Sequence, residues 1–234
     1  MTAIVLAGGA GGLGAATVEL LAEEGFPLVV SYLANAERAE KLSGIAKLVQ
    51  ADLTIAEDRE RLLDAAPDIY GLVVFTGDPA RIADPLQTEA AMLRSHAVNY
   101  LGPILLAREA AARMKAKSIQ GAIVLISTMQ AVALFPGSTA YAAPKAALLH
   151  AARILAKENR GPVNIRVNVI CPGVNAAGMA EASIASGKYD GYIKEGIVPR
   201  FGKAADVARA VRFFLQPDNY VTGQILTVDG GLTL

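Results

Sequence analysis

The sequence predicts an α/β fold, in which one doubly wound parallel sheet carries helices on both faces. Short apolar runs alternate with helix-like segments along all 234 residues, and the first run leads directly into a glycine-rich turn. Neither a repeat nor a linker divides the chain, so the alternation favours a single set of βαβ units. We therefore expect one domain over 1–234 with about seven strands, at 4–7, 27–32, 46–53, 69–75, 122–126, 165–171 and 223–228.

Composition and charge narrow the classes of function. Hydrophobic residues make up 53% of the chain, charged residues 19%, and the formal net charge is zero. A large core together with burial between subunits would account for so apolar a composition. The balanced charge gives no indication of a nucleic-acid or anionic-membrane partner, and no apolar run approaches the roughly 20 residues of a membrane span.

The N-terminal residues and the small number of Cys and His residues predict the location of the protein and the absence of a metal site. The first residues lack the basic segment of a signal peptide and instead form a strand that enters a glycine turn. One cysteine and two histidines give no metal-ligating cluster and no intrachain disulfide. We expect a cytoplasmic, enzyme-like domain without a metal site.

The glycine turn is the first candidate binding motif. Gly8, Gly12 and Gly14 lie between the strand at 4–7 and a helix predicted over 15–24. Glycines let the backbone approach a pyrophosphate closely, and the helix N-terminus offers free N–H groups and a positive dipole end. The spacing therefore predicts dinucleotide binding, with a merely tight turn as the alternative.

The ends of the next two strands bear on which nucleotide is bound. No acidic residue follows the second strand, where one would bind the ribose 2′-hydroxyl, so the sequence favours NADP(H) over NAD(H). Ser31 and Asn35 are candidate phosphate ligands, and Arg38 either joins them or lies on a helix surface. Asp52 ends the third strand, where it is expected to accept from the adenine amino group. The alternative is that Asp52 or Thr54 caps the helix predicted over 57–66, and both roles can hold together.

A long Ala-rich helix is predicted over 87–117, after a buried central strand that ends at Thr76 and Gly77. Asn99 lies in the middle of this helix. A buried amide needs a partner, so Asn99 either bonds to the backbone or holds a water.

The stretch from Ser127 to Lys145 holds the candidate catalytic groups. Tyr141 and Lys145 share one face of a helix predicted over 141–159, and a neighbouring ammonium is expected to lower the pKa of the phenol. The hydroxyl pair Ser127–Thr128 ends the strand before it. Pro144 fits this helix only in its first turn. Taken alone, the pair favours a surface tyrosine and a solvated lysine, because this spacing is common by chance.

The C-terminal third contains a predicted flap. Pro172 and Gly173 end the sixth strand, and the polar, glycine-containing segment at about 175–196 shows weak periodicity, which indicates a mobile cover over a site. A helix over 204–215 and the last strand complete the chain.

Together these motifs resemble the short-chain dehydrogenase/reductase family over essentially the whole chain, and within it the 3-oxoacyl-[acyl-carrier-protein] reductases. The three-residue gap between Tyr141 and Lys145 argues against the enoyl reductase branch, which uses a longer gap. The motifs that carry the resemblance are the glycine turn, Asp52-Leu53-Thr54, Asn99, Thr128, Tyr141-x-x-x-Lys145, Pro172-Gly173, Arg200-Phe201-Gly202, Val221-Thr222-Gly223-Gln224 and Asp229-Gly230-Gly231.

The resemblance implies a Rossmann-like fold and a role for each site residue. Tyr141 would be the general acid, Lys145 would lower its pKa and bind the nicotinamide ribose, Asn99 would hold a water in a proton relay, and Thr128 would take the place of the family's serine. The expected cofactor contacts are Gly8, Gly12, Leu13, Gly14, Ser31, Asp52, Leu53, Gly77, Tyr141, Lys145, Pro172, Gly173 and Asn175.

Four departures from the family pattern concern the same site. Thr128 adds a methyl group to the usual serine, and Val74-Phe75-Thr76-Gly77 stands where the family has Asn-Asn-Ala-Gly. Ala177 and Ala7 each replace a usual threonine. None of them removes the Tyr141–Lys145 pair, so we expect a divergent but active enzyme.

The leading hypothesis is an NADPH-dependent ketoreductase for a 3-oxoacyl thioester or similar ketone, small or carrier-bound, as in fatty acid or polyketide biosynthesis. The alternatives are an NAD-linked dehydrogenase of a small secondary alcohol or sugar, and a catalytically weak cofactor-binding subunit. The Ala-rich helices favour a homo-oligomer, either a tetramer or a dimer.

Overall fold

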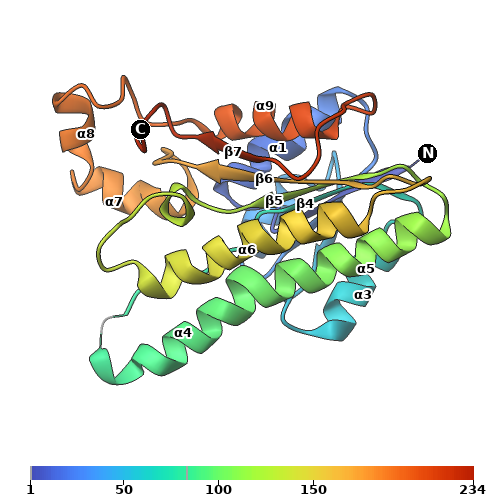
Figure 1. Ribbon diagram of the computed structural model, residues 1–234, viewed down its shortest axis with the longest axis horizontal. Helices are drawn as coiled ribbons and strands as arrows, with labels where there is room; N and C mark the ends of the chain where they lie inside the picture. Colours follow the sequence, from blue (N-terminus) through green and yellow to red (C-terminus); the bar gives the residue numbers. More distant parts are fainter. Residues whose placement is uncertain (1, 83) are drawn as a thin grey trace.

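The computed structural model describes residues 2–82 and 84–234, and in this part of the chain seven strands form one parallel sheet. The strand order is β3-β2-β1-β4-β5-β6-β7, which confirms the predicted doubly wound sheet (Figure 1). The strands are β1 (Ala3–Ala7), β2 (Leu28–Tyr32), β3 (Lys47–Gln50), β4 (Ile69–Val74), β5 (Ala122–Ile126), β6 (Arg166–Pro172) and β7 (Ile225–Val228).

Helices cover both faces of this sheet. In Figure 1, α1 and α9 lie above the strands, while the remaining long helices lie below them. The upper layer is α1 (Gly12–Glu23) and α9 (Ala204–Leu215), which pack against each other. The lower layer is α3 (Ala56–Asp64), α4 (Thr88–His96), α5 (Gly102–Ala116) and α6 (Thr139–Glu158).

The alternation of side chains along β1 shows how one strand serves two cores. Val5 and Ala7 belong to the core under α5 and α6, whereas Ile4 and Leu6 belong to the core under α1 and α9. Successive side chains of a strand point to opposite faces, so a strand buried on both sides must be apolar throughout. This explains the continuous apolar runs of β1, β4 and β5.

The strand order reverses between β1 and β4, since the chain leaves β1 toward β2 on one side and returns to β4 on the other. In open parallel sheets the crevice at such a reversal receives ligands at the carboxyl ends of the strands. Here it brings the glycine turn after β1 beside the segment after β4. A Cβ atom placed on Gly8 would lie 3.1 Å from both the backbone nitrogen and Cγ2 of Thr76.

The helix predicted over 87–117 is interrupted. A π-helical turn, Ala97–Leu101, separates α4 from α5 and contains Asn99. Pro103 lies four residues after Asn99 and has no N–H group, so the carbonyl of Asn99 loses its ordinary α-helical donor. The interruption therefore leaves a backbone acceptor beside the buried amide.

The expectation for Pro144 was wrong. The helix α6 begins at Thr139, two residues earlier than predicted, so Pro144 is its sixth residue and lies inside the helix. A proline there removes the N–H that would donate to the carbonyl of Ala140. The hydroxyl of Ser95, on α4, donates to that carbonyl instead, at 2.6 Å.

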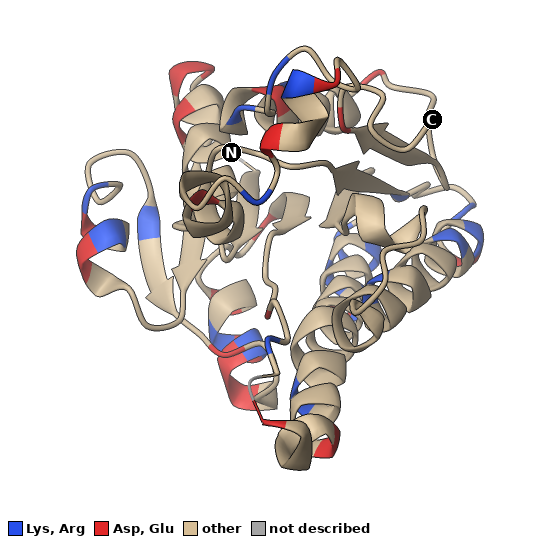
Figure 2. Cartoon of the chain, turned by 90° about the vertical axis from the view of Figure 1, so that its left-hand side faces the viewer, with Lys and Arg blue, Asp and Glu red and all other residues tan. Residues whose placement is uncertain are grey.

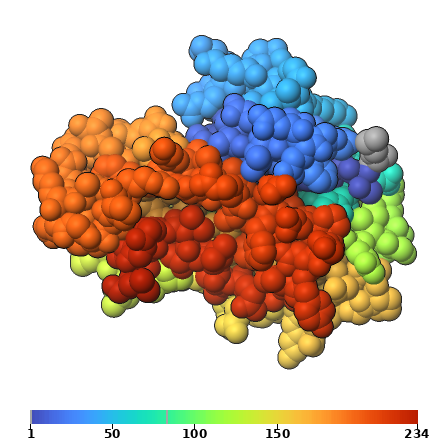
Figure 3. All heavy atoms as spheres, turned by 90° about the horizontal axis from the view of Figure 1, so that it is seen from above, coloured from blue at the N-terminus to red at the C-terminus, as the bar shows by residue number. Residues whose placement is uncertain are grey.

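The flap and the segment after β2 contain short helices that the sequence pattern did not predict. α7 (Glu181–Ala185) and α8 (Asp190–Lys194) lie within the flap, and α2 (Ala36–Glu40) follows β2. Figure 3 shows the flap, in orange, forming one end of the molecule beside the C-terminal residues, in red. Within the described residues, no helix is both long and apolar enough to cross a membrane.

Candidate active site

The glycine turn forms a cradle whose shape depends on missing side chains. Gly8 has a φ of +70°, and its N–H donates to the hydroxyl of Ser31 at 2.9 Å. A Cβ on Gly14 would lie 2.5 Å from the carbonyl oxygen of Gly9, and one on Gly12 would lie 2.5 Å from the nitrogen of Gly178. Only glycine fits these positions without displacing backbone.

Helix α1 begins inside this cradle. Gly11 is its N-cap and supplies no side-chain cap, and no acidic residue lies in the first turn. The N–H groups of Gly12, Leu13 and Gly14 therefore have no intrahelical partners and add to the positive dipole end. An anionic group is stabilised at such a terminus.

The polar residues after β2 are engaged in local contacts. Ser31 is buried, and its hydroxyl oxygen already accepts from Gly8. The side chain of Asn35 caps α2, where it accepts from the N–H of Arg38 at 2.9 Å. The guanidinium of Arg38 lies on the exposed surface of α2. Among the basic residues, Arg38 is the nearest in sequence to the end of β2.

Asp52 lies two residues beyond β3 and forms a local turn. Its Oδ1 accepts from the N–H of Thr54 at 2.9 Å and from the Thr54 hydroxyl at 2.7 Å. The N-cap of α3 is Ile55, so the expectation that Asp52 or Thr54 caps this helix was wrong. Leu53 is buried, and its carbonyl accepts from Arg59 at 2.9 Å. Contact of Asp52 with adenine stays a prediction.

Lys145 lies at the centre of the site. Its ammonium donates to the carbonyl of Thr76, which follows β4, at 3.0 Å, and to that of Ile126 at the end of β5, at 2.9 Å. An ammonium has three donors, so one remains for a ligand. Burial lowers the pKa of Lys145 to about 8. The lysine thus links two strand ends below the glycine turn.

Tyr141 faces the hydroxyl of Thr128, the residue that the resemblance placed in the position of the family's serine. Burial raises the pKa of Tyr141 to about 12, and a side-chain hydrogen bond with Thr128 acts in the opposite direction. The expectation that Lys145 lowers the pKa of this phenol is not met. Desolvation of the phenol outweighs other influences, and the lysine charge is directed at two carbonyls instead.

Ser127 and Thr128 point to different neighbours. The hydroxyl of Ser127 donates to the carbonyl of Lys145 at 2.9 Å, which ties the end of β5 to α6. The hydroxyl of Thr128 lies on the other side, toward Tyr141. Thr128 is therefore the hydroxyl available to a ligand, whereas Ser127 supports the helix.

The amide of Asn99 is fully occupied. Its Oδ1 accepts from the N–H of Asp78 at 3.0 Å, and its Nδ2 donates to the Asp78 carbonyl and to the Ser95 hydroxyl, each at 2.8 Å. The side chain can therefore donate to no water, and only the main-chain carbonyl, freed by Pro103, is left for one. A Cβ on Gly77 would lie 3.3 Å from Oδ1 of Asn99 and 3.7 Å from the Lys145 ammonium, so both of these side chains lie next to Gly77.

The flap is anchored at both ends near the strand β6. Asn175 pairs with Gly202 in a parallel bridge, with hydrogen bonds from Ala176 N–H to the Gly202 carbonyl at 2.8 Å and from Gly202 N–H to the Val174 carbonyl at 2.9 Å. The amide of Asn175 also donates to the carbonyl of Gly173 at 2.9 Å.

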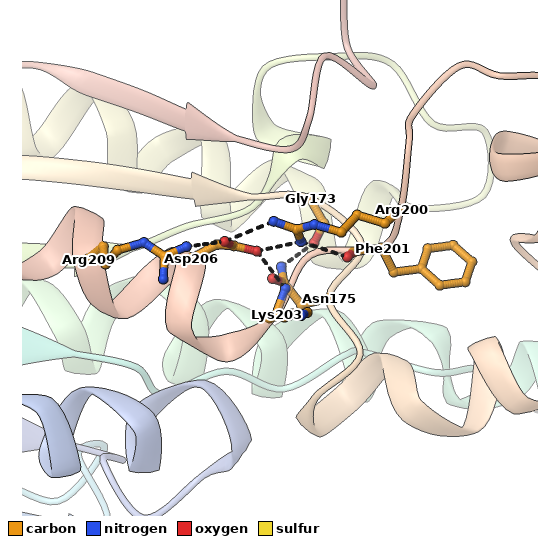
Figure 4. Close-up of polar contacts among 7 residues, drawn as sticks. All are labelled: Gly173, Asn175, Arg200, Phe201, Lys203, Asp206 and Arg209. Carbon is orange, nitrogen blue, oxygen red and sulfur yellow. Dashed lines mark hydrogen bonds and ion pairs between the residues drawn. The ribbon is translucent and has the colours of Figure 1, made fainter.

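A cluster of ion pairs fixes the chain that follows the flap. Figure 4 shows Arg200 and Arg209 on either side of Asp206, whose carboxylate also accepts from the N–H of Lys203 at 2.8 Å. Pro172 and Gly173, the other predicted cofactor residues here, lie at the end of β6, where Gly173 donates to Val228 at 2.9 Å. The cluster therefore ties the chain that follows the flap to α9 rather than offering free charge.

The residues present fit a bound dinucleotide. The glycine cradle receives a phosphate, one donor of Lys145 is free, and the hydroxyl of Thr76 is buried without a hydrogen-bond partner among the described residues. Figure 2, which views the carboxyl ends of the strands, shows charged residues mostly on the outer helices and loops, so few charged residues lie at the centre of this end. A phosphate cradle beside a partly buried tyrosine and a buried lysine and hydroxyl is the arrangement of a nicotinamide-dependent oxidoreductase.

Comparisons with known proteins agree with this class. A family model described as enoyl-(acyl carrier protein) reductase matches residues 8–233. The 3-oxoacyl-[acyl-carrier-protein] reductase of Rattus norvegicus is 33% identical over 236 residues, covering 97% of this chain and 96% of that protein. NADPH-dependent aldehyde reductase 2, chloroplastic, of Arabidopsis thaliana is 29% identical over 255 residues, covering 98% and 93%. A solved structure of a short chain dehydrogenase/reductase family protein superposes with a TM-score of 0.85 at 32% identity, covering 98% and 96%.

The chain belongs to the short-chain dehydrogenase/reductase family, and it is an oxidoreductase of the NAD(P)(H)-using kind. The resemblance drawn from the motifs is thereby confirmed. Sequence reasoning missed Ser95, which contacts Asn99, and Cys171, a buried thiol beside Ser127 and Lys145. A serine four residues before Asn99 on a helix was the available signal for the first, since residues at that spacing face each other.

Proposed function

We propose that the protein is an NADPH-dependent ketoreductase that reduces a 3-oxoacyl thioester or a related ketone to the alcohol. The observation that carries the proposal is the meeting of Tyr141, Thr128 and Lys145 in one buried site beside a phosphate cradle. Two hydroxyl groups that face each other can hold one carbonyl oxygen between them. The identity to a 3-oxoacyl reductase supports the substrate class.

The chemistry follows from the positions of the two hydroxyls. The nicotinamide, when bound, supplies the hydride that adds to the carbonyl carbon. Thr128 donates a hydrogen bond to the carbonyl oxygen, and Tyr141 transfers its proton to that oxygen as charge develops on it. With a pKa of about 12 the phenol stays protonated at neutral pH. An alkoxide is a stronger base than a phenolate, so the transfer is favourable.

Two further residues complete the proton path. Lys145 joins the ends of β4 and β5 through the carbonyls of Thr76 and Ile126, and its remaining donor would bind the cofactor ribose. The main-chain carbonyl of Asn99, which has no α-helical donor because of Pro103, would hold the water through which a proton returns. In this mechanism the side-chain amide of Asn99 only fixes the backbone of Asp78.

The preference for NADPH rests on charge at the end of β2. No carboxylate follows this strand to bind a 2′-hydroxyl, and Arg38 offers a positive charge for a 2′-phosphate. The NADPH-dependent relative from Arabidopsis thaliana supports this preference. Clearly tighter binding of NADH than of NADPH would favour the alternative, an NAD-linked dehydrogenase of a small alcohol or sugar.

The test is cofactor oxidation with acetoacetyl thioesters, ketones, quinones and sugars, using each nucleotide. We expect Tyr141→Phe to lower kcat about 10²- to 10⁴-fold because the proton donor is lost. Tyr70→Phe is the matched control, since that phenol bonds to the Leu215 carbonyl at 2.6 Å at the far end of the sheet. Undiminished turnover by Tyr141→Phe contradicts the mechanism, and tight cofactor binding without turnover favours a catalytically weak subunit.

Enoyl reduction is a second candidate, because the matching family model carries that description. It differs in the bond that is reduced, a carbon–carbon double bond next to the thioester. An enoyl thioester in the same assay decides between them. Faster oxidation of NADPH with the enoyl than with the 3-oxoacyl thioester would replace ketone reduction as the proposal.

We propose further that the protein is a homo-oligomer, either a dimer or a tetramer. Large apolar side chains are exposed on the outer helices, including Met92, Leu93 and Leu101 on α4 and the π-helical turn, and Ile154 on α6. Such faces are stabilised by pairing across a two-fold axis. Light scattering at micromolar concentration measures the mass, and a monomer contradicts the proposal.

A further inference from the structure

We propose that Ser95 is a positioning residue for Tyr141: its hydroxyl replaces the hydrogen bond that Pro144 removes from α6 and joins this helix to Asn99. The inference rests on the proposed function, because Tyr141 is the residue that is positioned. Ser95 lies on α4, 46 residues before Tyr141 in the chain, so the contact between them is tertiary.

The first step concerns the helix that carries Tyr141. Ala140 directly precedes the tyrosine, and its carbonyl would accept from residue 144 in a regular α-helix. Residue 144 is proline, so this acceptor has no ordinary partner in the helix. The Ser95 hydroxyl donates to it at 2.6 Å. The backbone beside Tyr141 is therefore held by a side chain from another helix.

The second step concerns the other side of the same hydroxyl. Ser95 is completely buried, and its oxygen accepts from Nδ2 of Asn99 at 2.8 Å. A hydroxyl donates one hydrogen bond and accepts others, so Ser95 serves both partners at once. Alanine at this position would leave an amide hydrogen and a carbonyl unpaired in a buried region.

The third step follows the connection to the strands. The Asn99 amide holds the backbone of Asp78, which follows Gly77 and β4, and the Asp78 carboxylate pairs with Arg94 on α4. Asp78, Asn99, Ser95 and Ala140 thus form one continuous hydrogen-bonded series. It sets the first turn of α6, and with it the phenol, relative to the end of β4 where Lys145 is bound.

The decisive experiment is a double-mutant cycle between Ser95 and Pro144. Ser95→Ala is expected to lower kcat about tenfold in the otherwise unchanged enzyme, with the Kd for NADPH changed less than twofold. Pro144→Ala restores an N–H for the Ala140 carbonyl. On that background Ser95→Ala is expected to lower kcat about threefold or less, because one of its two tasks is already performed. An equal tenfold loss on both backgrounds overturns the proposal.

A second measurement does not depend on turnover. Hydrogen exchange of the free protein is expected to rise at the backbone amides of 141–143 and 145 in Ser95→Ala and to return toward its original value in Ser95→Ala with Pro144→Ala. Unchanged exchange at these four amides in Ser95→Ala overturns the proposal. If Tyr141→Phe turns over substrate normally, the proposed function fails, yet the exchange result still decides whether Ser95 fixes this turn.

Asn159→Ala is the control for general loss of stability. Asn159 is buried at the other end of α6, and its amide donates to the carbonyl of Leu155 at 2.7 Å. This variant is expected to lower the free energy of unfolding without a selective fall in kcat. A similar tenfold fall in kcat in Asn159→Ala would show that Ser95→Ala reports only on the stability of α6, and the positioning role would be overturned.

Discussion

The two halves of the site are shaped by opposite kinds of special residue. In the nucleotide-binding half, Gly12 and Gly14 lack the side chains that would collide with Gly178 and Gly9. In the catalytic half, Pro103 and Pro144 lack the N–H groups that would occupy the carbonyls of Asn99 and Ala140. One half makes room for a ligand, and the other leaves backbone acceptors for a partner outside the helix.

This difference shows where each half is vulnerable. Adding a single carbon atom damages the glycine half, because backbone lies against backbone there. The catalytic half depends on buried polar groups, such as the Lys145 ammonium and the Ser95 hydroxyl, whose desolvation must be offset by hydrogen bonds. Substitutions in the first half should therefore act through packing, and those in the second through charge and hydrogen bonding.

The largest expected effect lies in the catalytic half. The pKa of Lys145 is about 8 in the folded protein against 10.5 for an ordinary lysine, so between these values the unfolded chain binds more protons and stability rises with pH. Lys145→Met removes this dependence. The free energy of unfolding of the variant minus that of the original protein should fall by roughly 3 kcal/mol from pH 8 to pH 10.5.

Urea denaturation at intervals across this range measures that difference. Lys157→Met, on the exposed side of the same helix, is the control for loss of one lysine. A difference between Lys145→Met and the original protein that does not change with pH would show that burial does not govern the charge of this lysine.

A packing effect of intermediate size is expected in the glycine half. Gly14→Ala places a Cβ 2.5 to 2.8 Å from backbone atoms of Gly9. It should destabilise the protein by about 1–3 kcal/mol and weaken the binding of both NADPH and NADH. Gly44→Ala is the matched control, since no atom lies within 4 Å of its added Cβ. Thermal unfolding and cofactor titration measure both effects, and equal behaviour of the two variants contradicts the packing account.

The smallest expected effects distinguish Ser31, which supports the glycine cradle, from Arg38, which is proposed to recognise the nucleotide. Ser31→Ala leaves the N–H of Gly8 without its acceptor and should cost about 1 kcal/mol of stability, weakening NADPH and NADH to a similar degree. Arg38→Ala should weaken NADPH alone. Fluorescence titration measures the ratio of the dissociation constants for NADPH and NADH. A loss of affinity confined to NADPH in Ser31→Ala would make this serine a phosphate ligand.

Much of the fold could be predicted because strands buried on both faces have an unmistakable pattern. The run Ala122–Ile126 is the observed β5, and the helix predicted over 204–215 is α9. The short α2 was missed because five residues are too few for helical periodicity to appear. The helices of the flap were missed for the same reason.

The site was predictable in its parts but not in its connections. The family resemblance separated Thr128 from Ser127, because Thr128 takes the place of the family's serine and alternate residues of a strand face opposite ways. No pattern in the sequence could show that Ser95 would reach Ala140, since that contact joins helices distant in the chain. The pKa of Tyr141 was expected to fall and instead rises, because burial depends on the whole fold.

The bridge between Asn175 and Gly202 makes the flap a loop with joined ends. The entropy of closing such a loop changes slowly with length, by about 0.6 kcal/mol for each doubling. Insertions, deletions or the exchange of the entire segment are therefore inexpensive for the fold, while the sheet and the Tyr141–Lys145 pair keep their places. We therefore expect changes in the flap to alter substrate choice without rebuilding the catalyst.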